Sequence, residues 1–389
     1  MRIFRLFIYI KECISFYNLA TSIKIFFYSV LKKNTRYPNY LLNFEKQASN
    51  FFRSKYALSF SNGTTACTAL LYSIGVKKNS KVIISKLTFP SVISSILRLG
   101  AIPVYLDFDK NLQISKEDIK KKKILDADFL LITHLYGIPQ KIEIIRSILD
   151  LNKKLLLIED ISHAQGAIIN DQIAGTLGEG SFMSMQGDKA INAGEGGLVL
   201  TNSINVYNRL NYLSHLNRKT SENNNINLLS RIGFIGKGRM SPLGAITASS
   251  DLRRLHKRNK TIKKKIKIIY ETLKNLEKIQ IPKIENYNHL GGFHYGIPFF
   301  CNYQSIIQKI KGEFTLVKYN WPILDASEYF QDSNKFLNLI YDNNPKIDNV
   351  FEKSNDLRDE LYFFDLKEII NFSEYKIKKK LILLKKNEI

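Results

Sequence analysis

The chain has 389 residues, 44% of them hydrophobic, so it is long enough for two or three domains and has a globular composition. Its net charge of +23 is compatible with nucleic acid, anionic membranes or phosphorylated substrates as partners. The basic residues are dispersed without interleaved aromatic residues, which excludes a nucleic-acid stacking platform, and a general richness in Lys, Ile and Asn explains the charge.

The cysteines and histidines limit which disulfide and metal sites the chain can form. Three cysteines, Cys13, Cys67 and Cys301, are odd in number and far apart, which excludes a disulfide framework and fits a reducing cytoplasm. The six histidines form no pair at the spacing of metal ligands. We therefore expect a cytoplasmic protein without a bound metal.

Residues 1–45 form an apolar and basic N-terminal arm. Charged residues such as Arg5, Lys11 and Lys24 interrupt its apolar run, so it matches neither a secretory signal nor a membrane span. Two interpretations stay open. The arm forms amphipathic helices packed on the protein or a partner subunit, or it lies as an interfacial helix at the inner face of the membrane.

From residue 56 onward, short apolar runs alternate with stretches of helical periodicity. Near-continuous apolar strands separated by helices predict an α/β fold with a mostly parallel sheet covered on both faces. Ligands collect at the carboxyl ends of such strands. The seven expected strands are residues 56–62, 81–86, 101–108, 128–134, 154–160, 181–186 and 197–202.

The pattern changes after about residue 245. Residues 251–279 predict one long, basic, amphipathic helix, and weaker strands, helices and Asn-rich loops follow Pro282. We therefore expect a large domain over 46–250 and a smaller C-terminal α/β domain over 251–389.

Polar residues follow two of the expected strands. The segment "SNGTTA" (61–66) opens a helix, where Gly63 permits close backbone approach and the free N–H groups suit a phosphate; plain helix capping is the alternative. The segment "IEDISHAQGA" (158–167) puts Glu159 and Asp160 at a strand end. Because a buried carboxylate needs a cation or a donor, this pair either caps the next helix or faces a cationic ring nitrogen.

Lys189 is the single lysine of residues 181–202, between an apolar strand and "GEGG". A partly desolvated lysine has a lowered pKa and attacks carbonyl groups, whereas an exposed loop lysine does neither. Pyridoxal phosphate requires a phosphate cradle, a strand-end Asp that keeps its pyridine nitrogen protonated, and a strand-end Lys that forms the Schiff base. The three features together therefore favour pyridoxal 5'-phosphate as the cofactor.

Over roughly residues 45–250 the sequence resembles the fold-type I, pyridoxal-phosphate-dependent sugar aminotransferases of the DegT/DnrJ/EryC1/StrS group. This resemblance implies a large domain with a seven-stranded, mostly parallel sheet and a smaller C-terminal domain. The motifs that carry it are, in order, "SNGTTA", "LTFPSVISSILRLGAIPVYLDFD", "THLYGIP", "IEDISHAQGA", "GTLGEGSFMSMQGDKAINAGEGGLVLTN" and "GRMSPLGAITASSDL".

The resemblance also implies residue roles. Lys189 would carry the cofactor and move the proton, and Asp160 would pair with the pyridinium nitrogen. His134 is either a site residue or a core histidine at a strand end, and the role of Glu195 is left open. The remaining cofactor contacts implied by the resemblance are Gly63, Thr64 and Ser184 at the phosphate, Phe89 stacked on the ring, and His163 near the phenolic oxygen.

The chain departs from the family in two places. Many members carry an Asn that the second subunit donates to the phosphate, and Lys237 stands there, able to meet a phosphate as a point charge. The resemblance therefore implies a homodimer with shared active sites, which the apolar N-terminal arm would help to cover. The region after about residue 283 matches poorly, except at 291–300 and 319–324.

The expected activity is transfer of an amino group from glutamate or glutamine to a keto sugar, nucleotide-linked, for surface polysaccharide or secondary-metabolite sugars. Two enzyme alternatives stay open: a keto-inositol (cyclitol) aminotransferase, and a B6-dependent sugar dehydratase, although such dehydratases lack the lysine kept here. The alternative from another class is an inactive scaffold that acts as a basic membrane or nucleic-acid binder. The aminotransferase interpretation expects no nucleic-acid partner and leaves open a peripheral membrane contact through the N-terminal arm.

Overall fold

The computed structural model describes residues 39–119, 124–214, 238–318 and 359–386, together with 21–23, 25 and 357. Most of the N-terminal arm, Lys237 and the segment 319–324 lie outside the described residues, so the expectations about them stay predictions. Within the described ranges, no helix combines the length and the apolar character that crossing a membrane requires.

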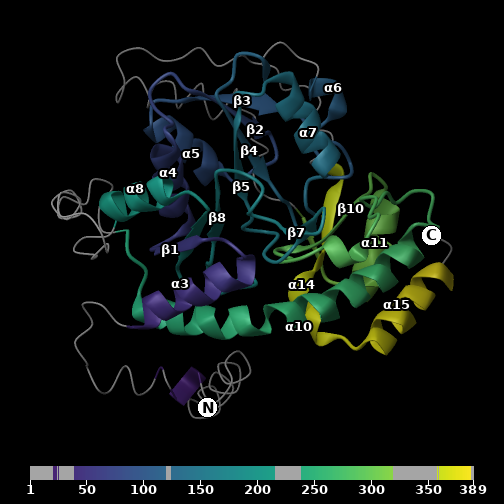
Figure 1. Cartoon of the computed structure of the whole chain (residues 1–389). Helices are drawn as coiled ribbons and strands as arrows, with labels where there is room; N and C mark the ends of the chain where they lie inside the picture. The colour runs from purple at the N-terminus through teal and green to yellow at the C-terminus, as the bar shows by residue number, and fades with distance from the viewer. Residues whose placement is uncertain are drawn as a thin grey trace.

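The seven expected strands all form and make one sheet, which confirms the predicted α/β fold (Figure 1). In spatial order they are β1 (Tyr56–Phe60), β9 (Gly197–Thr201), β8 (Gly180–Ser184), β5 (Leu156–Asp160), β4 (Phe129–Thr133), β2 (Lys81–Ser85) and β3 (Ile102–Leu106). β9 runs antiparallel to both of its neighbours, and each pair from β8 to β3 is parallel. The carboxyl ends of these parallel strands therefore share one edge.

Alternating side chains let helices cover both faces of the sheet. In β2, Val82 and Ile84 join one apolar cluster, and Ile83 joins another on the opposite face. Figure 1 shows the helices of the first face to the left of the sheet and α7 to its right. The first face carries α4 (Gly63–Ile74), α5 (Pro90–Arg98) and α8 (Ile204–Ser214), and the other carries α3 (Asn39–Phe52), α6 (Lys116–Ile119) and α7 (Ile142–Leu151).

The long basic helix forms as α10 (Pro242–Leu273), but the predicted bounds of 251–279 are wrong. It starts earlier because the Ser241 hydroxyl caps it, accepting from Leu243 N, and because Pro242 fits the first turn. Its first half packs on α3 and the sheet, and its second half packs in the C-terminal core. The expected domain boundary at residue 250 thus falls inside a continuous helix that joins the two parts, and the domain bounds stay a proposal.

The C-terminal part is a small α/β unit, as the sequence predicted. A three-stranded antiparallel sheet, in the order β10 (Gly296–Phe300), β12 (Leu361–Asp365) and β11 (Leu316–Lys318), packs against helices on an aromatic core. Its helices are α11 (Gln304–Glu313), α14 (Leu366–Asn371) and α15 (Glu374–Lys386). Shorter elements are the hairpin of β6 (Ile168–Ile169) and β7 (Gln172–Ile173), and the 3₁₀ turn η2 (Tyr287–His289).

Candidate functional site

The two carboxylates at the end of β5, Glu159 and Asp160, have different surroundings. Glu159 is fully buried, and its carboxylate accepts from Gly175 N at 2.8 Å and from Leu177 N at 2.7 Å. Asp160 is 3% exposed, and its Oδ1 accepts from Ser162 N at 2.9 Å. Strand alternation sends the two side chains to opposite faces. Glu159 therefore holds a turn of the scaffold, which leaves Asp160 as the candidate site carboxylate at the end of β5.

His134 is a core histidine by its contacts. Its Nδ1 accepts from Gln140 N at 3.0 Å, so the proton sits on Nε2 and is donated to Glu159 Oε2 at 3.2 Å. Both ring nitrogens are thus used by the scaffold.

Lys189 lies half-buried in the turn that follows β8. Burial lowers the pKa of Lys189 to about 8, although the negative charges of Asp188 and Asp160 oppose the shift. Burial likewise raises the pKa of Asp160, against its hydrogen bonds from Ser162 and the charge of Lys189. Lys189 and Asp160 are therefore close enough to influence one another, and the lysine is partly in its nucleophilic amine form near neutral pH.

The start of α4 touches the end of β8. The Asn62 side chain caps α4 by accepting from Thr65 N at 2.8 Å, which leaves the N–H groups of Gly63 and Thr64 without an acceptor inside the helix. A Cβ on Gly63 would lie 2.7 Å from the Cβ of Ser184, so only glycine allows this approach. Helix capping and the predicted phosphate cradle are thus compatible, because they use different N–H groups.

Phe89 stands at the same edge of the sheet. It precedes α5, and its side chain is 42% exposed. The neighbouring Thr88 hydroxyl lies 2.8 Å from the Thr133 hydroxyl, and Thr133 is in register with Asp160. An exposed aromatic ring at this level is what the predicted stacking role requires.

Gln165 connects these parts, and sequence reasoning missed it. Its amide is fully buried, donates to Ser184 O at 2.9 Å and accepts from Ile191 N at 2.7 Å. Ser162 adds a second tie, accepting from Ser184 N at 2.9 Å. Gln165 therefore fixes the loops of Asp160, Ser184 and Lys189 to one another. The sequence signal for Gln165 is a long amide side chain between residues that the hydrophobic pattern predicts to be buried.

Two imidazoles are close enough to Lys189 for its charge to influence them. The rings of His163 and His294 are 4.5 Å apart, and the buried Nδ1 of each has no hydrogen-bond partner among the described residues. Burial first, and then the charge of Lys189, lowers the pKa of both, that of His294 to about 4. Both rings are therefore neutral at physiological pH. An unpartnered nitrogen at His163 fits a ligand that brings its own polar group.

His294 reaches the site on a loop from the C-terminal part. A Cβ on Gly292 would lie 2.4 Å from Gln165 N, so the loop packs directly on the loop that follows β5. Arg258 of α10 donates to Gly292 O at 2.7 Å and holds the loop there. His294 Nδ1 lies 3.7 Å from Asp188 Oδ1. The sequence marked the segment 291–300 but not His294, because this contact depends on the tertiary fold.

Neither Glu195 nor a cluster of metal ligands contributes to the candidate site among the described residues. Glu195 is exposed in the loop before β9 and acquires no role. In the described part of the chain, no three His, Cys, Asp or Glu side chains gather as metal ligands, and no metal was predicted.

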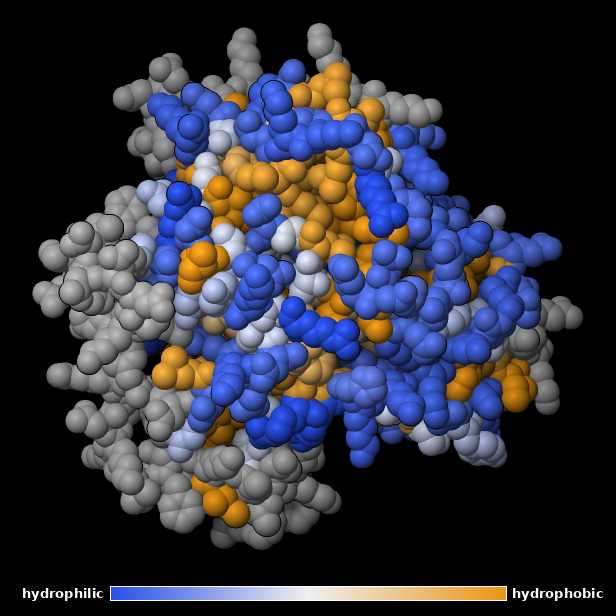
Figure 2. Space-filling model, in the orientation of Figure 1, coloured by the Kyte–Doolittle hydropathy of each residue, from blue (hydrophilic) through white to orange (hydrophobic). Residues whose placement is uncertain are grey.

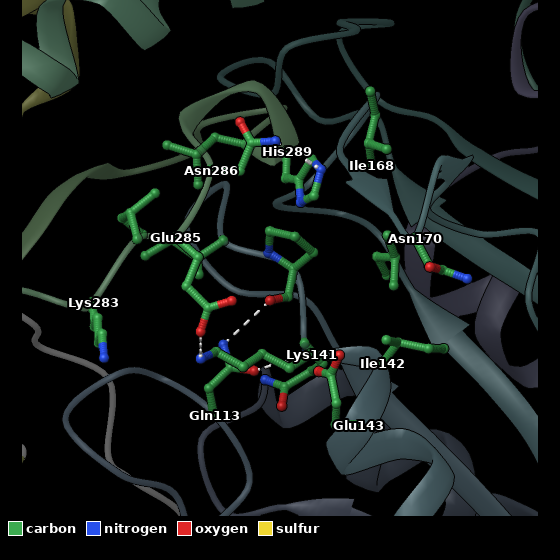
Figure 3. A pocket seen from close by; sticks show the side chains of 16 residues that line it. Gln113, Lys141, Ile142, Glu143, Ile168, Asn170, Lys283, Glu285, Asn286 and His289 are labelled. Atoms are coloured by element: carbon green, nitrogen blue, oxygen red, sulfur yellow. Dashed lines mark hydrogen bonds and ion pairs between the residues drawn. The ribbon is translucent and has the colours of Figure 1, made fainter.

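A separate hollow lies between the turn after β4, β6 and the segment 283–290 (Figure 3). Two pairs of its polar side chains interact with one another: Lys141 with Glu285, and Asn286 with His289 at 3.1 Å. None of the predicted site residues lines it. We therefore place the functional site at the strand ends.

Comparisons with known proteins identify the family of the chain. The model of the DegT/DnrJ/EryC1/StrS aminotransferase family matches residues 29–338. A GDP-perosamine synthase of Vibrio cholerae is 34% identical over 165 residues, which are 42% of this chain and 45% of that protein. The chain thus spans about half the length of the known relatives it matches.

Solved structures share the fold. An aminotransferase from Psychrobacter cryohalolentis superposes with a TM-score of 0.77 at 18% identity, covering 95% of this chain and 97% of that one. An E. coli GDP-4-keto-6-deoxy-D-mannose-3-dehydratase with bound hydrated PLP gives 0.74 at 18% identity, covering 95% and 97%. At this identity the likeness establishes the fold.

Proposed function

Because this chain belongs to the DegT/DnrJ/EryC1/StrS aminotransferase family, we propose that it transfers an amino group from glutamate or glutamine to a nucleotide-linked keto sugar, using pyridoxal 5'-phosphate. The product would serve surface polysaccharide or secondary-metabolite sugars. The GDP-perosamine synthase relative supports a nucleotide-linked sugar as the substrate class. Such a biosynthetic enzyme would work in the cytoplasm.

One observation carries the proposal. Lys189, with its pKa lowered to about 8, interacts with the buried Asp160 beside an N–H cradle at Gly63 and Ser184. These groups come from the ends of β5 and β8 and the start of α4. An amine, a carboxylate and an anion cradle at one edge match the three parts of the cofactor.

The chain's own residues then have distinct tasks. When bound, pyridoxal phosphate supplies an aldehyde that links to amines and a cationic ring that takes up electrons. The N–H groups of Gly63 and Thr64 and the Ser184 hydroxyl would hold the phosphate, Phe89 would cover one ring face, and His163 would approach the phenolic oxygen. The Asp160 carboxylate would keep the ring nitrogen protonated. Lys189 Nζ would accept and return the proton of the reacting carbon.

A screen of keto-sugar nucleotides tests the proposal directly. The purified protein is incubated with cofactor, glutamate or glutamine and each candidate sugar, and products are read by mass spectrometry. We expect one amino-sugar nucleotide and formation of the matching 2-oxo acid. Amination of a keto-inositol instead would favour the cyclitol alternative, and loss of a sugar hydroxyl without amination would favour a dehydratase.

Gly63→Ala should weaken cofactor binding by at least about 10-fold, or about 1.4 kcal/mol. The new methyl group would sit 2.7 Å from the Ser184 Cβ, so α4 and β8 must separate and the cradle opens. Equilibrium titration of the cofactor-free protein measures the effect. Gly312→Ala is the control, since a Cβ there meets nothing within 4 Å. If both variants bound the cofactor with equal affinity, the proposed phosphate site at Gly63 and Ser184 would be contradicted.

We propose further that the protein is a homodimer in which Lys237 of one subunit meets the phosphate held by Thr64 and Ser184 of the other. Mixing the variants Lys189→Ala and Lys237→Ala should partly restore activity after subunit exchange, because each mixed dimer regains one intact site. Light scattering of the mixture verifies the dimer. Full activity of Lys237→Ala alone, or no recovery despite proven exchange, would contradict the shared site.

A further inference from the structure

The C-terminal helix α15 has two different faces. Its inner residues Ile377, Leu381 and Leu384 are at most 2% exposed and pack in the C-terminal core. Its outer face also carries large apolar or aromatic side chains, with Tyr375 75% exposed and Ile382 54% exposed. Tyr375 and Ile382 are seven residues apart in the sequence and thus lie on one line along the helix. Leu383, 40% exposed, widens this patch.

Lysines surround the outer patch. Lys378 and Lys379 are exposed and lie between Tyr375 and Ile382 along the helix. Residues 366–386 contain seven lysines and two glutamates, which gives this end of the chain a strong positive charge. Figure 2 shows an apolar patch among hydrophilic residues at the lower right, where Figure 1 places α15.

Helix α10 provides an internal comparison. Its solvent face carries Lys257, Lys260, Lys264 and Lys267, all exposed. Between Lys257 and Lys267, its large apolar side chains Ile262 and Ile266 are buried. A general richness in lysine therefore accounts for the face of α10. It does not account for the exposed apolar side chains of α15.

We propose that the outer face of α15 docks on an anionic lipid bilayer. A helix that lies in a membrane interface places apolar and aromatic side chains at the acyl boundary and lysines among the headgroup phosphates, which matches this face. A second copy of the chain fits less well, because two such faces would bring lysines against lysines. A nucleic acid fits less well, because the uniformly charged face of α10 would serve it equally and the apolar side chains would stay unused.

The test uses sedimentation of the full-length protein with vesicles. We expect at least about 10-fold stronger partition into vesicles of phosphatidylglycerol and phosphatidylcholine than into phosphatidylcholine alone, reflecting attraction by the anionic surface. The double variant Ile382→Ser/Leu383→Ser should lower partition at least about 5-fold, since it removes the apolar area that inserts into the membrane in the proposed complex. The control Leu125→Ser/Ile204→Ser alters exposed apolar residues elsewhere and should change nothing.

A second pair of variants separates this face from the overall charge. Lys378→Glu/Lys379→Glu and Lys260→Glu/Lys264→Glu change the net charge equally, yet only the first should lower partition at least about 5-fold. Circular dichroism verifies that each variant is folded, and none of these positions belongs to the candidate site. Equal loss in both charge variants, or equal binding to neutral vesicles, would overturn the proposal. So would a change in oligomeric mass, rather than in partition, on altering Ile382 and Leu383.

Discussion

Lys189→Ala should lower turnover at least about 10³-fold, because a positioned proton-transfer group alone contributes about 10²- to 10⁴-fold and this lysine would also attach the cofactor. The loss follows from the position of its amine after the end of β8, where Asp160 influences it electrostatically and burial lowers its pKa to about 8. Turnover is measured with the sugar identified by the product screen, at saturating cofactor.

Lys86 provides a demanding control for this prediction. It also follows an apolar strand and is 5% exposed, but its ammonium group is paired with Asp107 at 3.0 Å. Lys86→Met should lower stability, because the partly buried carboxylate of Asp107 loses its ion-pair partner. It should retain turnover per folded molecule. Comparable turnover losses in both lysine variants would contradict the assignment of Lys189.

Asp160→Asn should lower turnover by roughly 10²-fold or more, the range for losing one preorganised electrostatic contact. An amide cannot keep the ring nitrogen protonated, although it can still accept from Ser162 N in the folded protein. We expect the variant to keep its fold and to bind the cofactor. Steady-state kinetics and cofactor titration measure the two effects separately.

Glu159→Gln should lower stability and leave turnover nearly unchanged, the reverse of what we expect for Asp160→Asn. The Glu159 carboxylate accepts from two backbone N–H groups and from His134, so one amide N–H₂ in its place would face a donor. Leaving a buried donor unsatisfied costs about 1–3 kcal/mol, which thermal denaturation would detect. Turnover per folded molecule should stay near that of the parent. A larger turnover loss in Glu159→Gln than in Asp160→Asn would mean that the wrong carboxylate was assigned.

Much of the large domain could be predicted from the sequence, for a physical reason. Strands buried on both faces are apolar throughout, so all seven stood out from the amphipathic helices between them. Because the carboxyl ends of parallel strands share one edge, the sequence pattern alone places Asp160 and Lys189 together. The alternation along β5 also separates Glu159 from Asp160 correctly.

The rest depended on contacts that the local sequence does not encode. The strand β12 pairs with β10 across more than sixty residues of chain, so neither run predicts the sheet that they form. His294 reaches His163 through a loop in which Phe293 and Tyr295 both adopt positive φ, which is rare for such side chains and which no propensity would predict. Gln165 is recognisable as a connector only once the loops it ties together are placed.

Borohydride reduction followed by peptide mapping tests the central claim most directly. Purified protein is loaded with pyridoxal 5'-phosphate, reduced to fix any covalent link, digested and examined by mass spectrometry. We predict the pyridoxyl group on Lys189, in protein that is yellow before reduction. A label on Lys86 or another lysine, or a protein that stays colourless with added cofactor, would contradict the account.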